Sequence, residues 1–232
     1  MISWLLAAVA LAASPAAELL AAVDEVSNRG DDAHLVLDIE TTDARGRPAE
    51  RTLEMWQKGE AQRLVRFTAP ARLAGVSLLV PDGETIYLYL PSFERVRRVV
   101  GEARGDAFLG TDFAMEDLAR LRWSEDYEPE LLAPRHLRLL PKEGRQTSSA
   151  RVELRVHDDE PLPARVEHYD EDGTVLRTIV FEDVREVDGR PLAHAIVVED
   201  VARSRTTRAT VREAAFDQGL EDALFTVHHL SR

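Results

Sequence analysis

The chain has 232 residues, 44% of them hydrophobic, which is enough apolar material for one large all-β domain or two small ones. Its formal net charge is -13, from 42 acidic and 29 basic residues. A nucleic-acid-binding protein needs a basic face to neutralise phosphates, so this balance argues against that class. The acidity is typical of a soluble surface that resists association.

An uncharged apolar run, Met1–Ala13, opens the chain. It is too short to span a bilayer, and small residues follow it, as in a secretory signal peptide. Ala10-Leu11-Ala12 and Ser14-Pro15-Ala16 both fit the cleavage pattern, while a buried N-terminal helix is the alternative interpretation. We expect a signal peptide at residues 1–16 and one domain at residues 17–232.

The chain has no cysteine. Its core must therefore supply stability without disulfides, even in an oxidising compartment. No cysteine follows the apolar run, so no lipid can be attached there as in a bacterial lipoprotein. We expect a released, soluble, monomeric protein without a lipid anchor.

A helix is predicted for residues 15–28, where apolar side chains recur at helical spacing. Downstream, apolar and polar residues alternate with a period of two, beginning with Leu35, Leu37 and Ile39, which is typical of strands. Asp172-Gly173 and Asp188-Gly189 are strong hairpin signals. Roughly ten or eleven strands, with turn signals about every 8–12 residues, predict a sandwich or barrel in one domain.

Residues 85–118 form the most informative segment. It begins with a strand that is apolar on both faces, with Tyr87 and Tyr89 on one of them. A basic strand follows, then a glycine-containing loop, then a short helix after Thr111. A strand that is apolar on both faces must be covered on both faces, and the loop and helix can supply one cover. The arrangement predicts a lid over a hydrophobic space.

Apolar residues of the strands and the lid are the candidates for lining that space, although the same pattern also fits a conventional core. They are Leu37, Ile39, Met55, Trp56, Phe67, Leu79, Tyr87, Tyr89, Phe108, Phe113, Met115 and Leu118.

The basic strand carries Arg95, Arg97 and Arg98 against the acidic background of the chain. One interpretation is a charged rim that meets anionic head groups or the acidic edge of a partner. The other is an edge strand that charge protects from aggregation.

Motifs of catalysis and metal binding are absent from the sequence. It contains no G-x-S-x-G elbow, no phosphate-binding loop, no H-E-x-x-H and no cysteine nucleophile. Most of the seven histidines alternate with apolar residues in predicted strands, and the acidic clusters fall at predicted turns. We expect no catalytic residues, no metal and no cofactor.

A succession of motifs through almost the whole chain resembles one known family. The motifs are Phe67–Gly75, Tyr89-Leu90-Pro91-Ser92, Arg95-Val96-Arg97-Arg98, Phe108–Phe113, Glu116-Asp117-Leu118, Leu162-Pro163-Ala164-Arg165 and Phe225. They resemble the outer-membrane lipoprotein-sorting (LolA-like) family of periplasmic proteins. The resemblance implies a mostly β fold with a few helices: a curved antiparallel sheet that forms an incomplete β-barrel closed by helices.

In that family the concave face receives the acyl chains of lipoproteins or other lipids. The resemblance therefore implies a soluble periplasmic carrier that transfers such chains toward the outer membrane, with an inner-membrane lipid or lipoprotein transporter as a partner. It supplies no catalytic residues. A ligand-sensing regulatory domain on the same fold is the first alternative. An enzyme is the second, and it needs a convergent polar cluster inside the cavity, which the sequence does not reveal.

Overall fold

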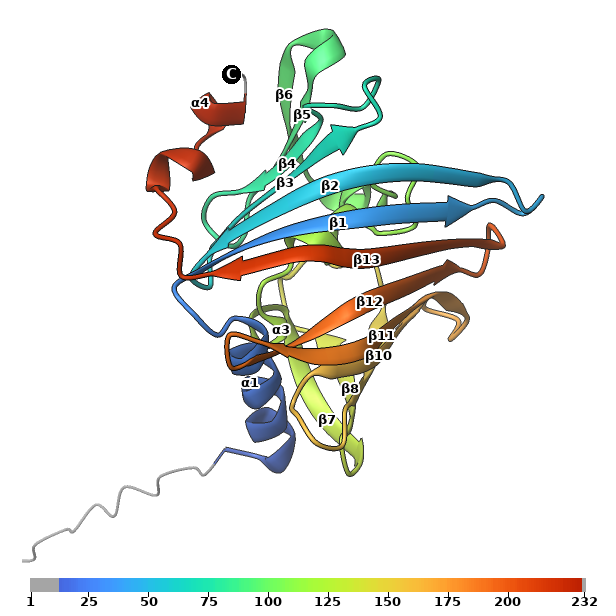
Figure 1. Cartoon of the computed structure of the whole chain (residues 1–232). Helices are drawn as coiled ribbons and strands as arrows, with labels where there is room; N and C mark the ends of the chain where they lie inside the picture. The colour runs from blue at the N-terminus through green and yellow to red at the C-terminus, as the bar shows by residue number, and fades with distance from the viewer. Residues whose placement is uncertain (1–12, 231–232) are drawn as a thin grey trace, which may run out of the picture.

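The structure is a computed structural model that describes residues 13–230. Most of the expected signal peptide, residues 1–12, lies outside the described residues. The described part contains one antiparallel sheet of 13 strands, in the order β6-β5-β4-β3-β2-β1-β13-β12-β11-β10-β9-β8-β7 (Figure 1). The prediction of a mostly β fold built on a curved, unclosed sheet is confirmed.

The strands, in chain order, are β1 (Asp32–Thr42), β2 (Pro48–Lys58), β3 (Gln62–Ala69), β4 (Ser77–Val80), β5 (Ile86–Leu90), β6 (Arg95–Val99), β7 (Tyr127–Ala133), β8 (His136–Pro141), β9 (Arg151–Val156), β10 (Pro163–Tyr169), β11 (Val175–Val187), β12 (Arg190–Asp200) and β13 (Arg205–Phe216). The α-helices are α1 (Pro15–Ser27), α2 (Met115–Ala119), α3 (Trp123–Asp126) and α4 (Val227–Leu230), and the 3₁₀ helices are η1 (Pro91–Phe93), η2 (Gly101–Gly105) and η3 (Asp222–Phe225).

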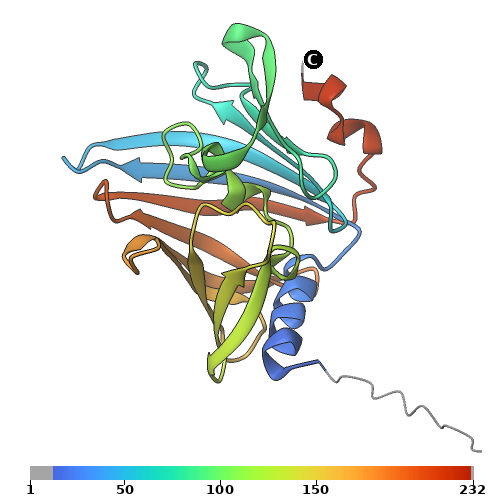
Figure 2. The same cartoon turned by 180° about the vertical axis from the view of Figure 1, so that it is seen from behind.

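The first and last strands of the chain pair with each other in the middle of the sheet, where β1 lies beside β13. The two edge strands, β6 and β7, are consecutive in the sequence. The chain must therefore pass from one edge to the other between them. Its path, which carries η2, α2 and α3, lies on the concave side of the sheet, in front of the central strands in Figure 2.

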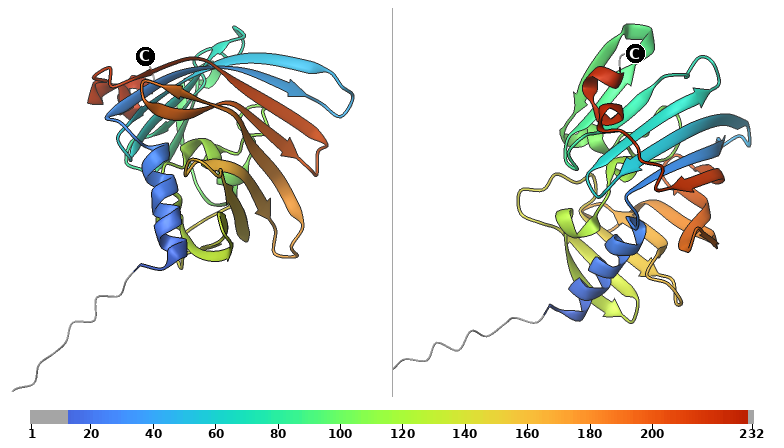
Figure 3. Two further views of the ribbon diagram at one scale, coloured as in Figure 1. Left: turned by 60° about the horizontal axis from the view of Figure 1, so that its bottom comes forward. Right: turned by 60° about the vertical axis from the view of Figure 1, so that its left-hand side comes forward.

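Helix α1 stands beside the open side of the curved sheet, as the left view of Figure 3 shows. The Ser14 hydroxyl accepts a hydrogen bond from the backbone N–H of Ala17 and so caps the helix, and Pro15 occupies its first turn. The Asp24 carboxylate accepts hydrogen bonds from the backbone N–H groups of Trp123 and Ser124 at 2.7 and 3.0 Å. The helix over residues 15–28 is confirmed, and the boundary expected after residue 16 falls inside it.

One strand lies within residues 125–134, where the sequence shows no regular alternation of apolar and polar residues. Strand β7 occupies Tyr127–Ala133, whereas about ten or eleven strands were expected without it. It is an edge strand that contains Pro129, and most of its residues are exposed after the buried Tyr127. Because the residues after Tyr127 are largely exposed on both faces, the strand has no buried face that would require a period-two pattern. The hairpin turns at Asp172-Gly173 and Asp188-Gly189 lie where they were predicted.

Apolar side chains are buried on both faces of the sheet. The concave face holds the larger core, which includes Ile86 and Leu88 together with residues of α1 and α2. The convex face holds a second cluster around Leu64 and Leu79, and the C-terminal segment Asp222–Leu230 covers it with Phe225. The expectation that β5 needs two covers is therefore confirmed, and the second cover comes from the far end of the chain.

Replacing Phe225 with alanine tests this second cover. Phe225 is 1% exposed, so its truncation should lower the free energy of unfolding by about 3 kcal/mol. The matched control is Val227→Ala in the same segment, where the side chain is 38% exposed and the expected loss is below about 0.5 kcal/mol. Urea unfolding measures both. A loss in Phe225→Ala as small as the loss expected for Val227→Ala would show that Phe225 does not stabilise the fold.

Candidate functional site

Two adjoining cavities lie between the concave face of the sheet, the end of α1 and the crossing segment. The outer cavity, of about 200 Å³, lies where the end of α1 meets strands β1, β2, β11 and β12. The inner cavity, of about 210 Å³, lies beneath residues Phe113–Trp123. Leu37, Met55, Phe181 and Ile196 line both of them, so the two cavities share apolar walls.

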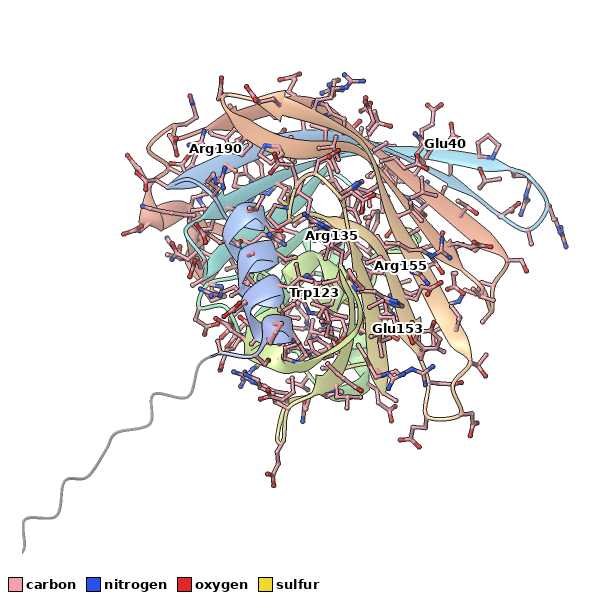
Figure 4. The ribbon with its side chains drawn as sticks, turned by 90° about the horizontal axis from the view of Figure 1, so that it is seen from below. Glu40, Trp123, Arg135, Glu153, Arg155 and Arg190 are labelled. Carbon is pink, nitrogen blue, oxygen red and sulfur yellow. The ribbon has the colours of Figure 1, made fainter. Side chains whose placement is uncertain are left out.

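Figure 4 views this region from below. Trp123, which lines the inner cavity, lies beside α1 within the curve of the sheet. Arg190, which lines the outer cavity, lies at the β11–β12 turn near the C-terminal end of α1. Arg29, which also lines the outer cavity, is exposed, so polar side chains lie where this cavity meets the surface, whereas the walls that it shares with the inner cavity are apolar.

Five of the residues expected to line a cavity do so. Leu37, Ile39 and Met55 come from β1 and β2, and Phe113 and Leu118 come from the crossing segment. All five line the inner cavity, and Leu37 and Met55 also line the outer one.

Three others lie in the packed core and line neither cavity. Phe67 and Phe108 are fully buried and stack on each other with ring centroids 5.0 Å apart, and Met115 lies in the same core. They fix the segment Phe108–Leu121, here called the strap, against the concave face. Their role in the structure is to anchor the cover of the cavity.

The remaining four lie on the opposite face of the sheet. Trp56, Leu79, Tyr87 and Tyr89 belong to the convex cluster under the C-terminal segment. Period-two alternation assigns residues to two faces but does not identify the concave one. These four are therefore corrected from cavity walls to the convex packing surface.

The basic strand lies away from both cavities. Arg95, Arg97 and Arg98 are exposed on β6, which is an edge strand, and none of them lines either cavity. The interpretation as a rim of this site is corrected accordingly. Exposed arginines on a strand edge fit protection against edge-to-edge pairing.

Five ionisable residues, here called the latch, tie the strap to the sheet. Glu116 and Asp117 come from α2, Arg120 follows it, and His168 and Arg177 come from β10 and β11. The Arg177 guanidinium lies 2.9 Å from each Asp117 oxygen and 3.2 Å from Glu116 Oε1. All five side chains are almost fully buried, so the charges are shielded from water.

Arg120 extends the latch toward α3. Its guanidinium lies 3.6 Å from Asp117 and 3.7 Å from Asp126, and it stacks over the Trp123 ring at 4.6 Å. Burial alone would lower the pKa of Arg120, but Tyr127, Glu116 and Asp117 raise it above its ordinary value. Arg120 therefore stays charged in the interior.

His168 is fully buried in the latch and is neutral. Burial, with the charges of Arg177 and Arg120, lowers its pKa well below the ordinary value of 6.5. Its Nδ1 lies 2.8 Å from the Ser149 hydroxyl and 3.3 Å from Arg177 Nη2. Arg177 can only donate, so Nδ1 is the accepting nitrogen and the ring proton is on Nε2, 3.5 Å from Asp117.

The latch also has features of a metal site and of a catalytic triad. Ligand atoms of Glu116, Asp117 and His168 lie within 4.8 Å of one another. However, Arg177 takes the position between them that a cation would take. Ser149, His168 and Asp117 are arranged in the order of a triad, but the lowered pKa of His168 makes it a weak base, and Ser149 is itself buried. The geometry fits an internal tether.

Further polar contacts hold the strap at its two ends. The Asp112 carboxylate accepts a hydrogen bond from the Thr207 hydroxyl at 2.7 Å and lies 3.0 Å from Arg205. At the other end, Arg63 of β3 donates to the carbonyls of Leu118 and Arg120 at 3.0 and 2.9 Å. The strap is therefore attached to strands on both sides of the cavity.

Sequence reasoning missed Arg63, His168 and Arg177. Each has a signal in the period-two pattern, because each shares the face of its strand with a core residue: Arg63 with Val65, His168 with Val166, and Arg177 with Ile179. A polar residue in phase with an apolar face is an indication of a buried network.

The comparisons with known proteins agree with this architecture. A family model described as that of an uncharacterized protein matches residues 59–232. The chain belongs to this family. No curated protein sequence matches it significantly.

Solved structures show that this family member has the LolA-like fold. A DUF1329 family protein from Desulfovibrio piger is 22% identical, with a TM-score of 0.82 over 92% of this chain and 96% of that one. An outer membrane lipoprotein-sorting protein domain from Vibrio parahaemolyticus is 21% identical, with a TM-score of 0.78 over 92% and 97%. A LolA superfamily protein from Nitrosomonas europaea is 23% identical, with a TM-score of 0.78 over 94% and 100%.

The helices of residues 13–230 include none with the length and apolar character needed to cross a membrane.

The neutral state of buried His168 makes the stability of this family member depend on pH. Its folded pKa is lowered, so below pH 6.5 the unfolded chain binds a proton that the native state excludes. Exclusion of this proton therefore has little effect on the free energy of unfolding above pH 6.5, and it lowers that free energy progressively as the pH falls below 6.5. Between pH 7 and pH 5 we expect the wild type to lose about 2 kcal/mol more than His168→Asn.

Urea unfolding at a series of pH values measures this difference. His194→Asn, which removes a histidine outside the latch, should keep the wild-type pH dependence. Parallel stability curves for the wild type and His168→Asn would mean that His168 is not held neutral.

Proposed function

We propose that the protein is a carrier that holds acyl chains of lipids or lipoproteins between the strap and the concave face of the sheet. The observation that carries this proposal is the pair of adjoining cavities with apolar walls beneath a cover that is fixed by contacts of its own. Apolar lining with few polar groups is what an acyl chain requires. The names of the lipoprotein-sorting structures with the same fold support the choice of ligand.

The carrier works by exchange. Burying an acyl chain stabilises the complex by roughly 0.8 kcal/mol per methylene, so even a short chain is bound usefully. The chain must also leave, which requires the strap to move. Polar contacts suit that purpose, because water replaces them when they break, whereas apolar packing has no such substitute.

We propose a soluble, monomeric protein of the periplasm that delivers its ligand toward the outer membrane, with an inner-membrane transporter as donor. The apolar run at residues 1–13 is the export signal in this proposal. Because Ser14 and Pro15 begin α1, cleavage after Ala12 preserves the helix cap, whereas cleavage after Ala16 removes it. The mass of the mature protein distinguishes the two sites.

No catalytic step is part of this function. The alternative of a sensing domain uses the same cavities but retains its ligand while it binds a regulatory partner. The decisive experiment is native mass spectrometry with lipid extraction, on protein purified from its own periplasm, followed by transfer of the bound lipid to acceptor vesicles. A carrier releases its lipid to the vesicles, and a sensor retains it. Protein that is free of lipid and takes none up from vesicles contradicts both.

A matched pair of substitutions on β12 tests the location of the ligand. Ile196 lines both cavities, whereas the next residue, Val197, points to the other face of the sheet. Ile196→Glu should reduce the co-purified lipid at least tenfold, because a carboxylate in the cavity opposes burial of an acyl chain. Val197→Glu should leave the amount unchanged.

Lipid extraction and quantification measure both variants, and circular dichroism checks that they fold. A folded Ile196→Glu protein that carries as much lipid as the wild type would place the ligand elsewhere.

A further inference from the structure

Arg63 brings a positive charge into apolar surroundings. It shares the concave face of β3 with Val65 and Phe67, and it lines both cavities. Its side chain is partly exposed, and that exposed surface faces the cavities. Arg63 therefore lies at the junction of the two spaces.

The hydrogen-bond partners of Arg63 are all neutral. Its guanidinium donates to the carbonyls of Leu118 and Arg120, and to Gln57 Oε1 at 2.5 Å. The residues that the structure describes form no ion pair with it, and its buried Nε has no hydrogen-bond partner among them. By contrast Arg120, which also lines the inner cavity, lies within 4.0 Å of three carboxylates.

A cation in such a position is costly for the empty protein. Burial lowers the pKa of Arg63 from its ordinary 12.5 to about 10, so it stays charged at neutral pH without a counter-ion. A guanidinium has five N–H donors, and three bonds are made, so two donors remain, one on Nη2 and one on the shielded Nε. The free Nη2 donor can form a charge-assisted hydrogen bond to an oxygen of a carboxylate or phosphate.

The carboxylates at the mouth of the outer cavity are already engaged. The Asp32 carboxylate accepts hydrogen bonds from three backbone N–H groups, those of residues 218–220, each at 2.8 Å. Asp217 pairs with Arg190, and Arg29 is exposed at the same mouth. Among the residues that line the outer cavity, Arg29, Arg63 and Arg190 are cations and Asp32 is the single anion, so the balance of charge favours entry of an anion.

The size of the site limits the apolar part of the ligand. Each cavity is somewhat larger than an engineered cavity of about 150 Å³ that binds benzene, and together they are less than three times that volume. This space suits one acyl chain, not two or three.

We infer that the ligand of the closed protein is a single-chain amphiphile with an anionic headgroup, a carboxylate or a phosphate, that pairs with Arg63 at the junction of the two cavities. The inference rests on the proposed carrier function and names the chemical class of its ligand. The acyl chain lies along the walls that Leu37, Met55 and Ile196 form.

Calorimetric titration of the delipidated full chain tests this inference with three ligands of equal chain length. They are palmitate, palmitoyl lysophosphatidylglycerol and the uncharged monopalmitoylglycerol, each below its micellar concentration. The wild type should bind at least one anionic ligand about tenfold or more tightly than the uncharged one, since a buried charged hydrogen bond supplies at least that factor. Preference between palmitate and the lysophospholipid identifies the headgroup source.

Variants of β3 assign the selectivity to Arg63. Arg63→Met should bring the ratio of anionic to uncharged affinity to about one, and Arg63→Lys, which keeps the charge without the planar fork, should give an intermediate ratio. Arg66→Met removes a positive charge from the opposite face of the same strand and should keep the wild-type ratio.

The outcomes distinguish a wrong ligand class from a wrong function. Equal affinity of the wild type for all three ligands overturns the inference and leaves the carrier function intact. Absence of binding by all three also overturns the inference, and the lipid that co-purifies from the periplasm then decides the carrier function. Wild-type selectivity that survives in Arg63→Met places the headgroup at another residue. If Arg63→Met does not fold, the ratios of the wild type and Arg63→Lys still decide.

Discussion

The first and last strands, β1 and β13, pair at the centre of the sheet, so the consecutive strands β6 and β7 lie at its two opposite edges. The chain therefore has to cross the concave face between β6 and β7. That crossing is also the only long connection available to cover the apolar side chains of the concave face in the described residues. A segment of this length covers the middle of a wide curved sheet but not all of it. The two cavities are the parts of the concave face that its side chains do not fill, the inner one beneath it and the outer one beside it.

The way the strap is attached determines how it can move. Phe108 is fixed by apolar stacking on Phe67, whereas α2 is held by the buried charges of the latch. A buried ion network contributes little net stability compared with apolar packing, yet the loss of one member is strongly destabilising. Such an attachment is therefore either complete or lost as a unit. The strap is expected to open at α2 while it remains anchored at Phe108.

The period-two pattern predicts much of this architecture. The predictions from it that were wrong have a physical cause. The alternation in β1 correctly places Leu37 and Ile39 on one face, and the apolar character of both faces of β5 correctly requires two covers. The pattern cannot identify which face is concave, because curvature arises from the pairing of all the strands. Tyr87 and Tyr89 were therefore assigned to the cavity when they belong to the convex cluster.

The latch could not be derived in the same way. Asp117, His168 and Arg177 lie in three separate elements, and only the crossing of the strap brings them together. Each strand taken alone shows a polar residue on an apolar face, which is a sign of a partner but does not identify it. The LolA-like resemblance predicted a covered concave face. Only the packing of the strap against the sheet identifies the residues that hold the cover in place.

Arg63 links the size of the ligand to the position of the strap. Three of its donors hold Gln57 and the strap carbonyls of Leu118 and Arg120, which leaves the free Nη2 donor for an anionic headgroup. In the proposed carrier, a single-chain ligand therefore occupies the cavities while the strap stays closed. A ligand with several acyl chains exceeds the space of the two cavities and must displace the strap, which breaks the bonds from Arg63 to Leu118 and Arg120. In the proposed carrier, the two Nη1 donors released from the strap are then available to the headgroup, so the side chain that holds the strap closed over a small ligand binds the headgroup of a large one.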